Sequence, residues 1–199
     1  MDSSDLLGSL MGQLGGGGIE QIGRSVGLDS GDVSKVLAGA MPAILAGLTR
    51  NTSSRAGAAG LLDVLDRNHD GSVLDDVMGY LGGGGNLADG AGILGHVLGG
   101  RQAHVEKAIS VSSGVDPASV GKTLAVVAPF LMGALGKAKR DHGLDASGLA
   151  AVLGQQQKAV SKASSSAVDL FSKILDSDGD PMDDIVKMGS GLLGGPFKS

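Results

Sequence analysis

The sequence lacks cysteine and tryptophan and is poor in other aromatic residues, with one tyrosine and three phenylalanines among 199 residues. Without cysteine no disulfide and no thiolate metal site can form, and the redox compartment stays undecided. The core has to be built from leucine, valine, isoleucine, alanine and methionine. No stretch alternates apolar and polar residues in the manner of a half-buried β-strand, so we expect no strands.

Positive charge is also in short supply, because 16 lysines and arginines face 21 acidic residues and give a formal net charge of −5. Affinity for a phosphate backbone comes from clustered lysine and arginine, so this balance argues against a nucleic-acid partner. The chain opens with Asp2 and Asp5, where a signal peptide would be basic. We therefore expect a cytoplasmic protein.

Long apolar runs of membrane-spanning length are missing. The uncharged runs Val36–Thr49 and Thr123–Gly136 are shorter than the ~20 apolar residues that a spanning helix needs, and each contains a proline. We interpret both as core helices and expect no membrane span.

What the chain does contain is a repeat. Residues 22–33 are echoed by residues 109–120 at a constant offset of 87, and the match continues over Lys35/Lys122, Leu37/Leu124, Pro42/Pro129, Ile44/Leu131 and Leu48/Leu135. We predict two related helical modules in tandem, residues 1–100 and 101–199. The second would carry an inserted polar tract at 155–166.

Each repeat has the signals of a helix, a tight turn and a second helix. Gly27 and Gly114 stand where a helix would end in a left-handed residue. Asp29 and Asp116 follow two residues later, a favourable place for an N-cap, and Pro117 would take the first helical position.

The second helix of each repeat should bury one face, because its apolar residues recur with a period of 3.6. Pro42 and Pro129 lie inside these helices, which predicts a kink or a restart. We expect further helices over 6–14, 19–26, 56–65, 77–81, 103–112 and 168–175, with polar loops at 49–55 and 137–145. The predicted fold class is all-α and multihelical.

Three features occur together: a glycine-rich start, a Gly-[Leu/Val]-Asp turn before an apolar helix with a central proline, and the segment Leu65–Leu81. In that segment, Leu-Asp-x-Asn-x-Asp-Gly-Ser-Val-Leu-Asp-Asp leads to a run of glycines. The sequence resembles the YidB-like bacterial family, domain of unknown function 937. The resemblance implies a multihelical fold and no established activity.

Residues 66–76, which we call the acidic segment, resemble a calcium-binding loop in their spacing. The candidate ligands are Asp66, Asn68, Asp70, Ser72 and Asp76. The first four match positions 1, 3, 5 and 7 of an EF-hand loop, but Val77 stands at position 12, where a bidentate glutamate is expected. The alternative is a turn in which Asp75 or Asp76 caps a helix over Val77–Leu81. The sequence leaves both interpretations open.

A second acidic stretch offers a weaker calcium site. Its candidate ligands are Asp176, Asp178, Asp180 and Asp184. Pro181 stands where the first stretch has a glycine and would alter the turn.

Catalytic patterns match only superficially. Gly23–Gly27 fits the G-x-S-x-G elbow around Ser25, but no strand precedes it. Gly121, Lys122 and Thr123 match the end of a phosphate-loop motif. Asp116 stands where that motif begins with glycine, and its carboxylate would repel phosphate. G-x-G-x-x-G occurs at 90–95 and 189–194, yet 36 glycines predict roughly one such match by chance. The four histidines are too scattered for a zinc site. We therefore expect no enzyme.

The sequence favours a non-enzymatic interaction or scaffold protein that binds a protein partner and forms a homo-oligomer. Frequent glycine and alanine would permit close helix contacts, either between the halves or between chains. One alternative is a calcium-binding module that uses the acidic segment. The other is a helix-turn-helix DNA-binding protein, although the second helices are apolar and the chain is acidic.

Overall fold

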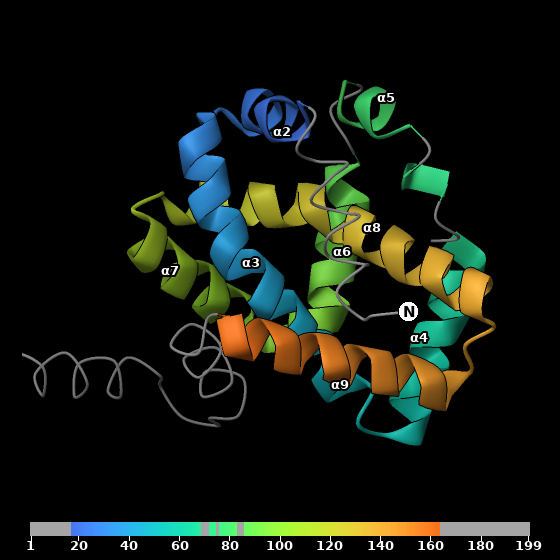
Figure 1. Cartoon of the computed structure of the whole chain (residues 1–199). Coiled ribbons are helices and arrows are strands. Elements are labelled where there is room, and N and C mark those ends of the chain that lie inside the picture. Colours follow the sequence, from blue (N-terminus) through green and yellow to red (C-terminus); the bar gives the residue numbers. More distant parts are fainter. Residues whose placement is uncertain (1–16, 69–71, 75, 83–85, 164–199) are drawn as a thin grey trace, which may run out of the picture.

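The computed structural model describes residues 17–68, 72–74, 76–82 and 86–163. In these ranges every regular element is a helix, which confirms the expected all-α, multihelical fold (Figure 1). The elements are α2 Gly18–Val26, α3 Ser30–Asn51, α4 Arg55–Asn68, η1 Ser72–Leu74, α5 Val77–Gly82, α6 Leu87–Leu98, η2 Gly99–Arg101, α7 Gln102–Ser113, α8 Pro117–His142 and α9 Ala146–Ala163.

The helices expected over 19–26, 56–65, 77–81 and 103–112 are confirmed as α2, α4, α5 and α7. The loop expected over 137–145 is wrong, because α8 continues to His142. A 3.3 Å ion pair between Lys137 and Asp141 links successive turns there, and basic side chains suit a helix C-terminus. The helices expected over 6–14 and 168–175 lie outside the described residues.

The loop expected over 49–55 and the polar tract at 155–166 also contain more helix or burial than their polarity indicates. α3 continues to Asn51 and α4 begins at Arg55, so the loop expected over 49–55 is much shorter. α9 runs through the first part of the polar tract at 155–166 and reaches Ala163. Gln156 in this tract is only 2% exposed, so the tract also contributes to the interior.

The two helix ends marked by glycine form as expected. Gly27 ends α2 with φ 79°, and Gly114 ends α7 with φ 76°, both in the left-handed region that suits glycine. The amide N–H of Gly27 donates to the carbonyl of Gly23, and that of Gly114 to the carbonyl of Ser110. The residues at each turn were therefore enough to predict where α2 and α7 end.

The expected N-caps are also present. Asp29 Oδ1 accepts a hydrogen bond of 2.8 Å from the N–H of Asp32, and Asp116 Oδ1 accepts one of 2.9 Å from the N–H of Ser119. Pro117 takes the first position of α8, where a missing N–H costs nothing. These caps fix where α3 and α8 begin.

Neither proline restarts its helix. α3 continues through Pro42 and α8 through Pro129, although each proline removes one helical hydrogen bond. Both prolines are buried, within the most densely buried part of their helices. Packing on several sides therefore holds each helix together where propensity alone would favour a break.

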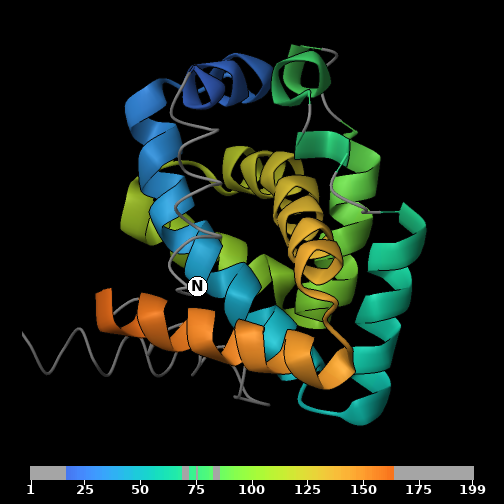
Figure 2. The same ribbon diagram turned by 45° about the vertical axis from the view of Figure 1, so that its right-hand side comes forward.

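α3 and α8 lie in contact at the centre, with the other helices arranged around them (Figures 1 and 2). α8 also packs on α6 and α7, and α3 on α7 and α9. One cluster of buried side chains contains residues from both halves of the chain, with Ile44 and Leu48 from α3 and Leu124 and Phe130 from α8. The division into modules 1–100 and 101–199 stays a prediction.

α6 crosses α8 at a glycine. A Cβ atom on Gly90 would lie 1.7 Å from the carbonyl oxygen of Ala125, so no side chain fits there. Pro129 lacks the N–H that this carbonyl would ordinarily accept in the helix. A C–H group of Gly90 therefore points at an oxygen that has lost its helical partner, which permits a weak C–H···O contact. The expected close packing through glycine thus occurs between helices of one chain.

α3 and α8 are long and apolar enough to cross a membrane, judged by length and composition alone. In each helix, 72% of the apolar window lies buried inside the protein. Core helices of soluble proteins have the same properties, so these two helices are weak evidence for a membrane location.

Candidate functional site: the acidic segment

The acidic segment begins inside a helix rather than in a loop, since α4 extends to Asn68. An ion pair of 2.8 Å between Arg67 and Asp63 supports the last turn of α4. Asp66 is the residue that would occupy position 1 of a calcium loop, and its carboxylate pairs with the ammonium group of Lys139 on α8. The side chain of Lys139 is 18% exposed and that of Asp66 59% exposed. A calcium ion bound by Asp66 would therefore have to compete with the ammonium group of Lys139.

The middle of the segment is held by its apolar residues. Val73 and Leu74 lie in η1 and pack, partly buried, against the core, and η1 contacts α8. Ser72, the candidate for position 7, begins this short helix and is exposed. These apolar contacts explain why η1 packs against α8 although it belongs to a segment rich in aspartate.

Asp76 acts as a helix cap. Its Oδ1 accepts a hydrogen bond of 2.8 Å from the N–H of Gly79, and its carbonyl accepts one from the N–H of Tyr80. A Cβ atom on Gly79 would lie 2.0 Å from the other carboxylate oxygen, so the Asp76 side chain would have to shift if position 79 carried a side chain. The interpretation of Asp76 as the cap of α5 is confirmed.

The proposed calcium ligands are only partly described. Asp66, Ser72 and Asp76 lie in described residues, Asn68 is described in its backbone alone, and Asp70 lies outside them. The weaker set, Asp176, Asp178, Asp180 and Asp184, lies outside the described residues. Within the described ranges, no group of three or more histidine, aspartate or glutamate side chains is placed to hold a metal ion. Calcium binding by either stretch stays a prediction.

Tyr80 connects α5 to the core and was not singled out from sequence. Its ring meets that of Phe130 edge to face, with centroids 5.2 Å apart. Its hydroxyl oxygen accepts a hydrogen bond of 3.0 Å from the N–H of Asn86, just before α6. Burial raises the pKa of the Tyr80 hydroxyl, and the hydrogen bond from Asn86 opposes that shift. Composition could have drawn attention to this residue, because Tyr80 is the single tyrosine of the chain.

The residues of the catalytic patterns take part in helices. Ser25 lies in α2 and its hydroxyl donates to the carbonyl of Ile22 at 2.8 Å. Lys122 is an exposed residue of α8, and the glycines of 90–95 lie within α6 rather than in a loop before a helix. The second G-x-G-x-x-G match, at 189–194, lies outside the described residues.

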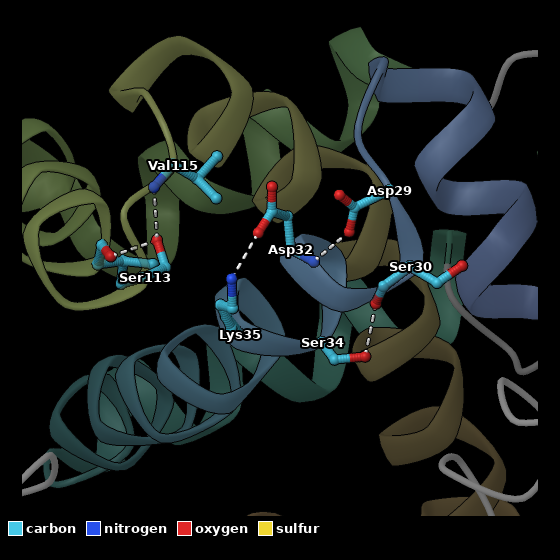
Figure 3. A network of polar contacts seen from close by, with 8 residues as sticks. Asp29, Ser30, Asp32, Ser34, Lys35, Ser113 and Val115 are labelled. Atoms are coloured by element: carbon cyan, nitrogen blue, oxygen red, sulfur yellow. Dashed lines mark hydrogen bonds and ion pairs between the residues drawn. The ribbon is translucent and has the colours of Figure 1, made fainter.

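Figure 3 shows the polar contacts at the turns of the two helix pairs. At the start of α3, the ammonium group of Lys35 pairs with Asp32 at 2.7 Å, and this hydrogen bond raises the pKa of Lys35. At the start of α8, the N–H of Val115 donates to the hydroxyl of Ser113 at 3.3 Å. The ammonium group of Lys35, which a DNA-binding α3 would present to the groove, is thus paired with the carboxylate of Asp32 on the same helix.

Comparison with known proteins adds a family and no activity. No curated protein and no solved structure matches the chain. The model of a bacterial protein family of unknown function, DUF937, matches residues 8–138. This match covers more than half of the chain and runs through both helix pairs. The chain therefore belongs to the bacterial family DUF937.

Proposed function

We propose that this protein is a non-enzymatic helical module that binds proteins and associates with further copies of itself. The observation that carries the proposal is an apolar side chain left in solvent: Val111 on α7 is 76% exposed. Met78 on α5 and Leu87 on α6 are 52% and 40% exposed. Binding of a partner that covers exposed apolar area of this kind is favourable, because it removes that area from water.

The roles of the polar side chains support a non-enzymatic function. The hydroxyl groups of Thr52, Ser113 and Thr123, which are buried, each donate to the backbone carbonyl four residues earlier. Asp29, Asp76 and Asp116 are engaged as helix caps. These groups serve the fold, whereas catalysis requires a nucleophile, a base and an orienting group converging on one point.

The neighbours of Val111 make α7 the best place to test the proposal. In the first helix pair, the matching position is Arg24, which lies 3.7 Å from Glu20 in an exposed ion pair. The second pair has an apolar residue there, next to the exposed and polar Ser112. A charged residue at position 111 is thus compatible with a helix pair of this kind.

The test is sedimentation velocity on the full chain from low to high micromolar concentration. We expect association of the wild type, weakened by Val111→Glu and unchanged by the matched control Ser112→Glu. A monomer at high micromolar concentration would refute self-association. Equal effects of the two variants would show that Val111 is not at the interface.

A further inference from the structure

The Gly-[Leu/Val]-Asp turn occurs a third time, at residues 143–145 between α8 and α9. Gly143 ends α8 with φ 61°, and the N–H groups of Gly143 and Leu144 both donate to the carbonyl of Lys139. The turn between α2 and α3 has the same pair of hydrogen bonds. Asp145 then caps α9, because its Oδ1 accepts a hydrogen bond of 2.8 Å from an N–H in the first turn of that helix. The same local signals therefore join α8 to α9.

The third turn differs from the first two in where the helices beside it pack. α2 packs on α3, and α7 packs on α8, so the first two turns each lie within a packed pair. α9 instead packs on α3 and α4, which both belong to the first half of the chain (Figures 1 and 2). α4 in turn packs on α8 and α9. The last helix of each half therefore lies on the central helix of the other half, and residues 143–145 are the connection that carries α9 there.

The face of α9 that meets the first half is apolar and buried. Leu149 and Leu153 are both 0% exposed and belong to the same cluster as Ile44 and Leu48 of α3. Exposing these side chains to water would cost much of the stability of the protein, unless an identical surface received them. A second copy of the chain offers that surface, because its α3 and α4 have the same sequence and the same fold.

We propose that two copies of this chain exchange α9, with residues 143–145 as the hinge. In the exchanged dimer, α9 of each copy lies on α3 and α4 of the other, so the contacts of α9 are kept. The hinge becomes helical and joins α8 to α9 in one long helix. Gly143 opposes that helix, because glycine favours the left-handed turn. At the turn before α8, Pro117 also opposes a continuous helix, whereas residues 143–145 contain no proline.

The exchange is a second way for two copies to associate. It rests on the proposed self-association only in joining two copies of the chain, because it requires no exposed apolar surface and does not involve Val111. Variants at the hinge and at Val111 therefore test the two modes separately.

The first test is sedimentation velocity on the full chain after refolding from urea at high micromolar concentration. Gly143→Ala strains the left-handed turn and favours a helical hinge in both copies, so it should raise the association constant of the dimer at least about tenfold. Gly114→Ala is the matched control, because it strains a left-handed turn whose helices pack on each other and are separated by Pro117. It should weaken the fold without adding dimer. The exchange is overturned if Gly143→Ala adds no dimer or if Gly114→Ala adds as much.

Two further variants separate the exchange from association through Val111. Adding Val111→Glu to Gly143→Ala should leave the exchanged dimer unchanged. Inserting Gly-Ser-Gly-Ser after Gly143 should remove it, because a long flexible hinge lets α9 return to its own chain. A dimer that Val111→Glu abolishes, or that the insertion leaves unchanged, would overturn the exchange and support surface association. A wild type that stays monomeric without refolding, together with a refolded Gly143→Ala dimer, would support the exchange and refute surface association.

Discussion

The helix pairs α2–α3 and α7–α8 make the same turn, but different kinds of oxygen accept the hydrogen bond from the residue after the glycine. In the first pair, the N–H of Leu28 donates to the carbonyl of Gly23 at 2.9 Å. In the second, the N–H of Val115 donates to the hydroxyl of Ser113 at 3.3 Å (Figure 3). Gly23 has no room for a Cβ, because the Leu28 carbonyl oxygen would lie 2.5 Å away, whereas its match is Ser110. The repeat therefore specifies a backbone turn, and each copy completes it in its own way.

The two central helices differ more in what packs on them. Phe130 of α8 matches Ala43 of α3, and both are 0% exposed. The ring of Phe130 meets Tyr80, which comes from α5 in the first half of the chain. The difference shows that the halves are not two equivalent cores placed side by side, because each contributes to the environment of the other.

Replacing the larger member of this pair should have the greatest effect on stability. Phe130→Ala gives α8 the residue that α3 has, and it leaves a cavity beneath Tyr80 that costs about 3–5 kcal/mol in the free energy of unfolding. Urea denaturation followed by circular dichroism measures the loss. Tyr80→Phe, which keeps the ring and removes the hydroxyl, should cost less. A loss below about 1 kcal/mol for Phe130→Ala would show that the site collapses without penalty.

The crossing of α6 and α8 should be the next most sensitive place. Gly90→Val forces a side chain onto the Ala125 carbonyl and should cost about 1–3 kcal/mol. Gly92 is the control, because a Cβ there meets nothing within 4 Å, and Gly92→Ala should gain about 0.5–1 kcal/mol through helix propensity. If both substitutions had the same sign, the close approach at Gly90 would not be a real constraint.

The two N-caps should be worth the same amount, since their geometry is the same. Asp29→Ala and Asp116→Ala should each lower the urea midpoint by a similar amount, and the asparagine variants should lower it much less because asparagine also caps. Unequal losses in urea denaturation would mean that the two caps, although alike in geometry, contribute differently to the stability of the protein.

The ion pair between Asp66 and Lys139 should contribute less. The position matching Lys139 is the buried Thr52, so this link exists on one side of the repeat only. Lys139→Met should cost at most about 1 kcal/mol, and the loss should shrink in high salt.

Calorimetric titration with calcium separates the two interpretations of the acidic segment. If Asp66 serves the ion pair and Asp76 the cap, calcium should give no binding heat with the wild type. Asp76→Asn should then keep the stability of α5. Saturable binding that Asp66→Ala abolishes would instead establish a calcium site.

The smallest expected effect is on acid stability. Hydrogen bonds from Ser119 to Asp116, and from the N–H of Gly148 to Asp145, lower the pKa of both carboxyl groups in the folded protein. Their contribution to stability is therefore present above the unfolded pKa and is lost as the pH falls through the lower, folded value. The urea midpoint should drop between about pH 5 and pH 2. The variant with Asp116→Asn and Asp145→Asn should drop less, and an equal drop would contradict this assignment.

The sequence could predict what depends on neighbouring residues. The left-handed glycines and the caps at Asp29 and Asp116 all involve atoms a few residues apart. The cap at Asp76 is equally local, but the sequence left it open against Asp75 and against a calcium site. Periodicity predicted one buried face for each central helix, but residues 39–48 of α3 and 123–136 of α8 are buried all round, because other helices pack on several sides of them.

Long-range contacts could not be predicted in this way. Asp66 and Lys139 are 73 residues apart, so their spacing in the sequence does not predict an ion pair. The pattern of the acidic segment instead indicated that Asp66 would be a metal ligand. Gly90 could equally have been a helix breaker, because only its position against Ala125 shows why glycine is needed. The end of α8 was placed too early, because charged residues resemble a loop until the pairing of Lys137 with Asp141 is seen.

Amide hydrogen exchange along α3 and α8 is the most direct test of the account, which holds that both halves build one core. We predict that the slowest amides around Ile44 and Leu124 open with the same free energy, equal to that of global unfolding, and that Phe130→Ala lowers both together. Two distinct opening energies, with only α8 responding to the substitution, would show that each half folds by itself.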